Sequence, residues 1–259
     1  MGRSTMIHDF AITEHDVVFW EMPVLFDMDD AIRMIQDPSS GALPFHWDAS
    51  YGSRLGVMPL GGPASAIRWV DIEPCYVYHG VNAHRDGNDV VVDVCRLDSA
   101  FAPASTPSSL SLHRWRIDTS GPTLRVSDQR IDSPPADLPM IDRRFTGRVQ
   151  RHAWLAPTRT VTGAVDFGGV VHQDFRTGQV STWDPGPDRS AGEWLFVPRG
   201  ATPASDDGDG WVMSYVYDHT RDRSDLVVLE ATDVARGPVA TVHLPARVPF
   251  GFHATWVPT

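Results

Sequence analysis

Three of the eleven histidines in the chain follow apolar or aromatic residues and precede a small or polar turn. His8 lies in MIHDFAIT, His79 in PCYVYHGVNAH and His253 in PFGFHATW. This setting is typical of a strand end whose side chain points into the protein. Imidazole binds iron, copper, zinc or nickel, and an all-histidine set with open positions suits a redox metal. A single histidine is more often a surface residue than a ligand, so the three are candidate ligands only as a set.

The other histidines show no local metal motif. No pair has the spacing of a zinc-binding helix such as HExxH, so a metal site must be assembled from distant strands. The same absence disfavours a zinc hydrolase. His84, His172 and His219 stand beside polar turn residues, where a solvated ring is expected, and His243 alternates with its neighbours as a strand residue.

Two acidic residues in apolar surroundings are candidate partners for such ligands. Glu193 lies in SAGEWLFVPRG and Asp137 in ADLPMID. A metal-bound imidazole generally donates its second N–H to a carboxylate or carbonyl, which fixes the ring. Both acids also fit an ordinary role in a turn or a helix cap, so the two interpretations stay open at this point.

Composition limits the class of protein. The chain has 259 residues, 42% of them hydrophobic and 21% charged, which is enough to bury a core. A net charge of -11 argues against a nucleic-acid partner and against a polybasic membrane patch. Cys75 and Cys95 cannot form a disulfide framework and are predicted to be buried thiols, as in a reducing cytoplasm. There is no signal-peptide pattern and no long apolar run, so we expect a cytoplasmic protein.

The elements that must position these residues are predicted to be strands. Short runs rich in Val, Trp, Tyr and Ile alternate with turn signals such as RDGN and DTSGP. The runs cover residues 15–26, 54–60, 67–72, 89–97, 111–118, 210–218, 225–231 and 239–245. Only residues 27–35 suggest a helix, and residues 96–109 read as a surface loop. The fold class is therefore all-β, and a blade-repeat propeller and a sandwich both fit.

Six segments of the chain resemble, in order, the carotenoid cleavage oxygenase family. They are MIHDFAITEHDVVF, SRLGVMPL, EPCYVYHGVNAHRDGNDVVVDVCRL, DLPMIDRRFTGR, GEWLFVPRGATPASDDGDGWVMSYVYD and SDLVVLEATDVARGPVATVHLPARVPFGFHATWVP. The resemblance runs from Met6 to Pro258. It implies a seven-bladed β-propeller in which four histidines hold one non-haem Fe(II). The implied activity uses O2 to cleave an alkene bond of an apolar carotenoid, apocarotenoid or stilbene.

The resemblance also assigns site residues. His8, His79 and His253 match three of the four iron ligands, and Glu193 matches the carboxylate that orients the last of them. The family's glutamate partner of the middle ligand falls on Asp137, whose side chain is one methylene shorter. Aromatic candidates for lining the substrate tunnel, which fit the core equally well, are Phe45, Trp47, Trp194, Phe250 and Phe252.

Family members are about twice as long as this chain, and the resemblance covers only their C-terminal half. Residues 1–259 thus read as a single propeller region that supplies the later blades of an incomplete ring, without a counterpart of the first ligand. Three explanations fit: a start assigned too far downstream, a degenerate gene, or a chain that needs a partner chain. An inactive propeller fragment is therefore the alternative to an iron-dependent dioxygenase.

Overall fold

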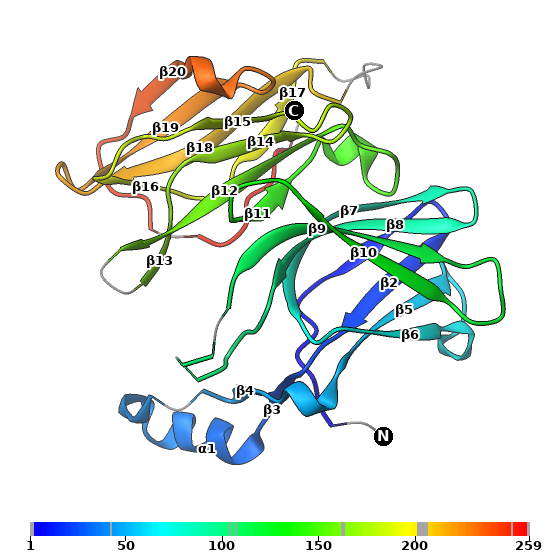
Figure 1. The fold of residues 1–259 in the computed structure, drawn as a ribbon. Coiled ribbons are helices and arrows are strands. Elements are labelled where there is room, and N and C mark those ends of the chain that lie inside the picture. Colours follow the sequence, from blue (N-terminus) through cyan, green and yellow to red (C-terminus); the bar gives the residue numbers. More distant parts are fainter. Residues whose placement is uncertain are drawn as a thin grey trace. The chain divides into compact units, whose positions relative to one another are not determined.

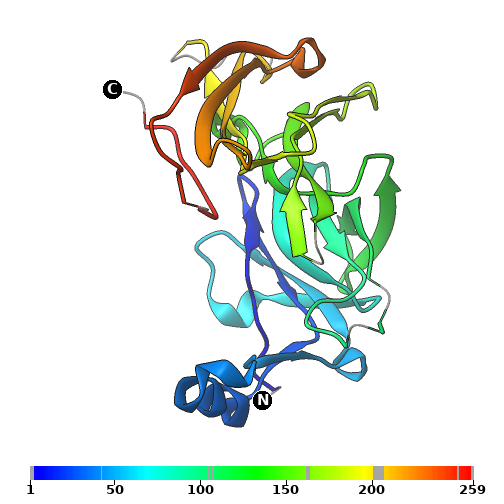
Figure 2. The same cartoon turned by 90° about the vertical axis from the view of Figure 1, so that its left-hand side faces the viewer.

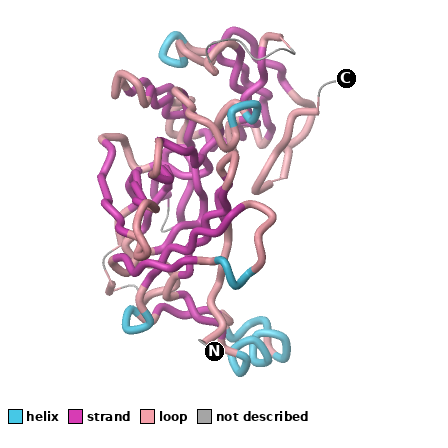
Figure 3. The backbone as a smooth tube through the Cα atoms, turned by 90° about the vertical axis from the view of Figure 1, so that its right-hand side faces the viewer, coloured by secondary structure: helices cyan, strands magenta, loops and turns pink. Residues whose placement is uncertain are grey.

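The chain folds mainly into β-strands (Figure 3). The computed structural model describes residues 3–41, 43–103, 105–106, 108–161, 164–200, 207–249 and 251–257. The chain divides into two compact units, residues 1–130 and residues 131–259. Each unit contains two antiparallel sheets built on four strands in a row, the size of a propeller blade (Figure 1).

The first unit holds the sheets β1-β2-β5-β6 and β10-β9-β8-β7. Their strands are β1 (Phe10–Ile12), β2 (Asp16–Glu21), β5 (Ser53–Pro59), β6 (Arg68–Ile72), β7 (Tyr76–Asp86), β8 (Asp89–Leu97), β9 (Leu110–Asp118) and β10 (Arg125–Ile131). Between β2 and β5 lie the paired strands β3 (Val24–Phe26) and β4 (Phe45–Trp47) and the helix α1 (Met28–Gln36). The 3-10 turns of this unit are Pro38–Ser40, Ala49–Tyr51 and Ala64–Ala66. The Asp27 side chain begins α1 by accepting hydrogen bonds from two backbone N–H groups of its first turn.

The second unit holds the sheets β11-β12-β14-β15 and β16-β18-β19-β20. Their strands are β11 (Ala136–Met140), β12 (His152–Val161), β14 (Val170–Asp174), β15 (Val180–Trp183), β16 (Arg189–Ala191), β18 (Gly210–Asp218), β19 (Arg223–Glu230) and β20 (Pro238–His243). Strand β13 (Ala164–Phe167) pairs with β12, and β17 (Leu195–Pro198) pairs with β18. The 3-10 turns are Arg143–Phe145 and Val234–Arg236.

Each unit has its own hydrophobic core, built on fully buried tryptophans. Trp20 and Trp115 lie in the core of the first unit, and Trp154 and Trp194 in that of the second. A buried tryptophan side chain removes a large apolar area from water, which favours folding. In the second unit the two indole N–H groups donate to the backbone carbonyls of Ala231 and Gly169, so these rings bury no unpaired donor.

The position of the first strand in each sheet matters for the site. In each of these four larger sheets, the two-stranded sheet β3-β4 aside, the strand that comes first in the chain lies at an edge: β1, β7, β11 and β16. In a propeller one edge of every blade faces the central channel. Strands β1 and β7, from the two sheets of the first unit, lie next to each other. Residues on or beside β1 and β7 can therefore lie close enough to contact each other.

Several sequence predictions are confirmed. All eight predicted strand runs contain strands, and helix α1 occupies the one predicted helical segment. Both cysteines are buried free thiols, and burial raises the pKa of Cys75 to about 11. No helix among the described residues has the length and apolar character needed to cross a membrane. The single propeller region over residues 1–259 stays a prediction, because the structure resolves two compact units.

The prediction for two histidines was wrong. His84 and His172 lie on strands β7 and β14 rather than in solvated turns, and His172 is only 6% exposed. His219 is exposed after β18, as predicted, and His243 lies at the end of strand β20. The polar neighbours of His172 misled the interpretation, because β14 is buried on both faces.

Burial of His172 makes the stability of the protein depend on pH. Its Nε2 lies 2.9 Å from Nδ1 of His152, and burial, together with that neighbour, lowers the pKa of His172 from 6.5 to about 4. Between these two values the unfolded chain binds a proton that the native protein does not, so stability falls as the pH drops through this window. The loss should be on the order of 3 kcal/mol and complete near pH 4.

Urea unfolding at about pH 7 and about pH 5 measures this dependence. We expect a smaller difference between the two pH values in His172→Gln than in the unaltered chain. Asp174 and Asp218, whose pKa values are held low by Arg151 and by Thr220 and Arg221, titrate well below this window. An equal pH dependence in both proteins would contradict the assignment to His172.

Candidate metal centre

The first unit brings His8 and His79 together. His8 lies two residues before the edge strand β1, and His79 lies on the edge strand β7. Their ring centroids are 5.1 Å apart and the rings are nearly perpendicular. Nδ1 of His8 lies 3.0 Å from the backbone carbonyl oxygen of Tyr78. Because a carbonyl only accepts hydrogen bonds, this contact places the proton on Nδ1 and leaves a lone pair on Nε2.

The strand that carries His79 is irregular around that residue. The register of β7 against β8 shifts between Val77 and Gly80 and again between Gly80 and Asn82. Bulges of this kind change the direction of a side chain and are common beside active sites. A Cβ on Gly80 would lie 2.9 Å from Cη2 of Trp20, so glycine is the residue that fits against this core ring. The bulged strand and the buried indole together set the backbone at His79.

The second unit brings His253 and Glu193 together. Glu193 follows the edge strand β16, and its side chain is only 8% exposed. Nδ1 of His253 lies 3.1 Å from Oε1 of Glu193, and the backbone N–H of Ala254 donates to Oε2 at 2.6 Å. The carboxylate therefore holds both the ring of His253 and the backbone that follows it. As at His8, the acceptor beside Nδ1 places the proton of a neutral ring on that nitrogen, so Nε2 carries a lone pair.

The segment that carries His253 runs back along the second unit after β20 (Figure 2). Its described residues form no helix or strand. Side-chain contacts fix it instead: Arg143 donates to Oγ1 of Thr255 at 2.9 Å and to the carbonyl of Ala254 at 3.4 Å. The backbone N–H of Val248 donates to Oγ of Ser224 at 3.0 Å. The segment is thus held at one end by strand β19 and near the other end by the 3-10 turn Arg143–Phe145.

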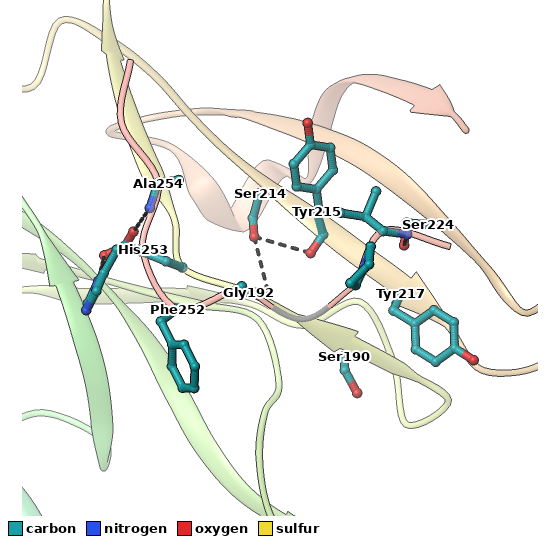
Figure 4. Close-up of a pocket in the computed structure, with 13 residues that line it drawn as sticks. Ser190, Gly192, Ser214, Tyr215, Tyr217, Ser224, Phe252, His253 and Ala254 are labelled. Atoms are coloured by element: carbon teal, nitrogen blue, oxygen red, sulfur yellow. Dashed lines mark hydrogen bonds and ion pairs between the residues drawn. The ribbon is translucent and has the colours of Figure 1, made fainter. Parts of the chain in front are cut away.

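A cavity of about 190 Å³ lies beneath this segment (Figure 4). Serine and tyrosine side chains of the sheet line it on one side, and residues around His253 line it on the other. Ser214 closes part of its floor, since its hydroxyl accepts from Gly192 N–H and lies near the carbonyl of Tyr215. The side chain of Phe252 is 84% exposed. The lining of the cavity is mostly apolar, and its polar groups include the hydroxyl groups of the serines and tyrosines and the ring of His253.

Asp137 lies on strand β11, the first strand of its sheet. The register of β11 against β12 shifts directly after it, and Leu138 has a φ of 50°. Oδ1 of Asp137 accepts a hydrogen bond from the N–H of Leu138 at 2.8 Å. A left-handed leucine is uncommon and strained, so this bulge is another local irregularity at a predicted site residue. His79 belongs to the other unit, and its pairing with Asp137 therefore stays a prediction.

Four of the five predicted site residues lie at equivalent positions in their sheets. His8, His79, Asp137 and Glu193 each lie on or beside the first, edge strand of one of the four sheets, and His253 is hydrogen-bonded to Glu193. The structure shows two pairs, His8 with His79 and His253 with Glu193. No group of three or more His, Cys, Asp or Glu side chains that could hold a metal is found among the described residues.

The donor set fits a transition metal. Two of the three predicted ligands give their Nδ1 protons to fixed oxygen acceptors, which is the arrangement found for metal-bound imidazoles. Neutral nitrogen ligands of this kind suit iron, zinc, copper or nickel. The residues present therefore fit the iron that the family resemblance implies, and they do not by themselves select it over the other three metals.

Sequence reasoning missed the residues that hold the ligands in place. Asp9 and Arg143 contact the ligand-bearing segments, and the Tyr78 carbonyl accepts from His8. An acid directly after a candidate ligand, as in HDF, was a signal that could have identified Asp9. Nothing near Arg143 in the sequence indicates its contact with residues more than a hundred positions away.

The aromatic candidates for a substrate tunnel have different positions. Trp194 is fully buried in the core of the second unit. Phe45 and Trp47 are half-buried on β4 and pack against the core of the first unit. Phe252 alone of the described candidates is strongly exposed, and Phe250 lies outside the described residues.

Comparison with known proteins gives consistent results. The family described as RPE65, retinal pigment epithelial membrane protein, matches residues 1–258. A carotenoid cleavage oxygenase of Mycobacterium tuberculosis is 34% identical over 304 residues, which cover 100% of this chain and 59% of that protein. Isoeugenol monooxygenase of Pseudomonas nitroreducens is 30% identical, over 97% of this chain and 54% of that protein.

The fold agrees with these sequence matches. The crystal structure of a lignostilbene dioxygenase from Pseudomonas brassicacearum superposes with a TM-score of 0.85 and 27% identity, over 99% of this chain and 56% of that one. The chain thus spans a little more than half the length of these proteins. Its four-stranded antiparallel sheets are consistent with the propeller blades of these proteins. From the match over residues 1–258 and this shared fold, the chain belongs to the carotenoid cleavage oxygenase family.

Proposed function

We propose that the chain takes part in the oxidative cleavage of an alkene bond, with O2 as oxidant and one Fe(II) bound by His8, His79 and His253. The substrate class is an apolar polyene or stilbene-like molecule. The relatives support this choice, since their names include a carotenoid cleavage oxygenase, an isoeugenol monooxygenase and a lignostilbene dioxygenase. All three names refer to oxygenases, and their substrates share an alkene next to other unsaturated groups.

The hydrogen bonds at Nδ1 of His8 and His253 carry the proposal. In each case the neighbouring oxygen is an acceptor held by the fold, a strand carbonyl for His8 and a buried carboxylate for His253. The remaining nitrogen, Nε2, is then free of a proton and can donate its lone pair to a metal. A surface histidine without a fixed acceptor would exchange between its two tautomers and would bind a metal less well.

The residues around the ligands have separate tasks in this proposal. A bound Fe(II) would supply the redox chemistry that O2 and an alkene need. Neutral imidazoles leave the positive charge of the ion uncompensated, and Glu193 keeps the ring of His253 in one orientation. We assign no general acid or base, because oxygen insertion into an alkene requires no proton at the outset. Asp137 is proposed as the acceptor for His79, where its shorter side chain weakens the contact.

Metal binding by the full chain tests the proposal. We expect about one equivalent of Fe(II) per chain, and O2 uptake when isoeugenol, a hydroxystilbene or an apocarotenal is added. His253→Ala should weaken metal binding at least about tenfold, because it removes one of three ligands. Affinity is measured by competition with a chelator, and O2 uptake with an oxygen electrode.

His243 offers a matched control for His253. Its Nδ1 also contacts a carboxylate, Asp225, at 2.8 Å, but it lies on β20, at the opposite edge of the sheet from β16. His243→Ala should leave metal affinity unchanged. Absence of bound iron in the unaltered chain, or equal losses in both variants, would count against the proposal and in favour of a non-catalytic propeller fragment.

A second test concerns Glu193. In Glu193→Gln the side chain keeps its size but loses its charge and one of its two acceptor oxygens, so it cannot hold both His253 and Ala254 as before. We expect metal affinity to fall by about 10- to 100-fold, the usual effect of removing the partner of a ligand. Glu230→Gln, which disturbs an exposed contact with Arg199, is the control. Unchanged affinity in Glu193→Gln would refute its orienting role.

A further inference from the structure

Asp9 connects the two ligand-bearing segments of the first unit. It stands between His8 and strand β1, and it is half-buried. Its Oδ2 accepts a hydrogen bond from the backbone N–H of Gly80 at 2.9 Å, and its Oδ1 accepts one from the N–H of Phe10 at 2.8 Å. One carboxylate thus satisfies a backbone donor on its own segment and another on β7.

The contacts of His8 and Asp9 bracket His79. His8 donates to the carbonyl of Tyr78, the residue before His79, and Asp9 accepts from the N–H of Gly80, the residue after it. Strands β1 and β7 belong to different sheets, so no backbone ladder joins them. At this point the two side-chain hydrogen bonds, rather than backbone hydrogen bonds, join the His8 segment to β7.

The irregular backbone of β7 makes such a contact necessary. The register of β7 changes on both sides of Gly80, and a strand with an interrupted ladder leaves N–H groups that need another acceptor. Asp9 supplies that acceptor, and Trp20 packs against the same glycine from the core. Gly80 is therefore held by a carboxylate and by an indole ring.

We propose that Asp9 is a positioning residue that sets the separation and orientation of the His8 and His79 rings. This inference rests on the proposed function, because only that function gives the two rings a common metal to bind. The two hydrogen bonds of its carboxylate go to backbone N–H groups, that of Gly80 directly after His79 and that of Phe10 two residues after His8, so it acts through the backbone next to each ligand. Its carboxylate matters because two acceptor oxygens are needed, one for each segment.

The test compares Asp9→Ala and Asp9→Asn with Asp118→Ala in the full chain. Asp118 is a matched control, since its Oδ1 also accepts a backbone N–H bond, from Ser120 at 2.9 Å, at the far end of β9. The first measurement is hydrogen exchange at the Gly80 amide of the metal-free protein. The second is the affinity for Co(II) and the visible absorption of the bound Co(II), which reports its ligand geometry.

We expect Asp9→Ala to expose the Gly80 amide to exchange and to weaken Co(II) binding about tenfold or more, with an altered absorption band. Asp9→Asn, which retains one acceptor oxygen, should fall between Asp9→Ala and the unaltered chain. Asp118→Ala should resemble the unaltered chain in both measurements. A loss of thermal stability similar in Asp9→Ala and Asp118→Ala would show that the change in Co(II) binding is not a general effect of destabilisation.

The outcomes separate this inference from the proposed function. If Asp9→Ala retains Gly80 protection and binds Co(II) as the unaltered chain does, the positioning role is wrong while the metal site stands. If the unaltered chain binds no metal, the proposed function fails and the positioning role fails with it, even where Gly80 protection is lost; that contact would then be structural only. Loss of both protection and affinity in Asp9→Ala alone supports the inference.

Discussion

An imidazole that is to bind a metal must give its other N–H to a fixed acceptor, and much of this structure follows from that requirement. Without an acceptor the proton moves between the two ring nitrogens and the ring can rotate. At His8 the acceptor is a strand carbonyl, and at His253 it is a buried carboxylate. One acceptor, the Tyr78 carbonyl, belongs to an edge strand, and the other, Glu193, lies two residues after one, so the location of these edges in the sheets decides where such a site can be built.

Four meandering sheets supply these edges repeatedly. Each sheet begins at an edge strand, and each of those strands carries or adjoins one predicted site residue. Edge strands also tolerate bulges, and two of them, β7 and β11, are bulged beside His79 and Asp137. The regular inner strands and the tryptophan cores provide the rigid support, while the irregular edges direct the functional side chains. This separation of tasks lets residues far apart in the sequence lie close together, as His8 does with His79 and Glu193 with His253.

The sequence predicted the fold class and the strongly apolar strands well, because alternating Val, Trp and Ile residues report burial directly. It did not identify β10, whose residues RVSDQRI are mostly exposed, or mixed strands such as β12. His172 was misread because its polar neighbours hide a strand that is buried on both faces. The contact between Glu193 and His253 was predicted through the family resemblance and is present. The roles of Asp9 and Arg143 depend on backbone geometry, which residue types alone do not encode.

One carboxylate in the second unit has a consequence for how the protein responds to its surroundings. Glu193 accepts from the ring of His253 and from the backbone of Ala254, in a segment that has no ladder of its own. Any ion that favours the oriented ring therefore also favours the docked segment, and by reciprocity anything that docks the segment strengthens the hold on the ion. Docking of the segment that carries His253 and binding of an ion by that ring would then be coupled in one equilibrium.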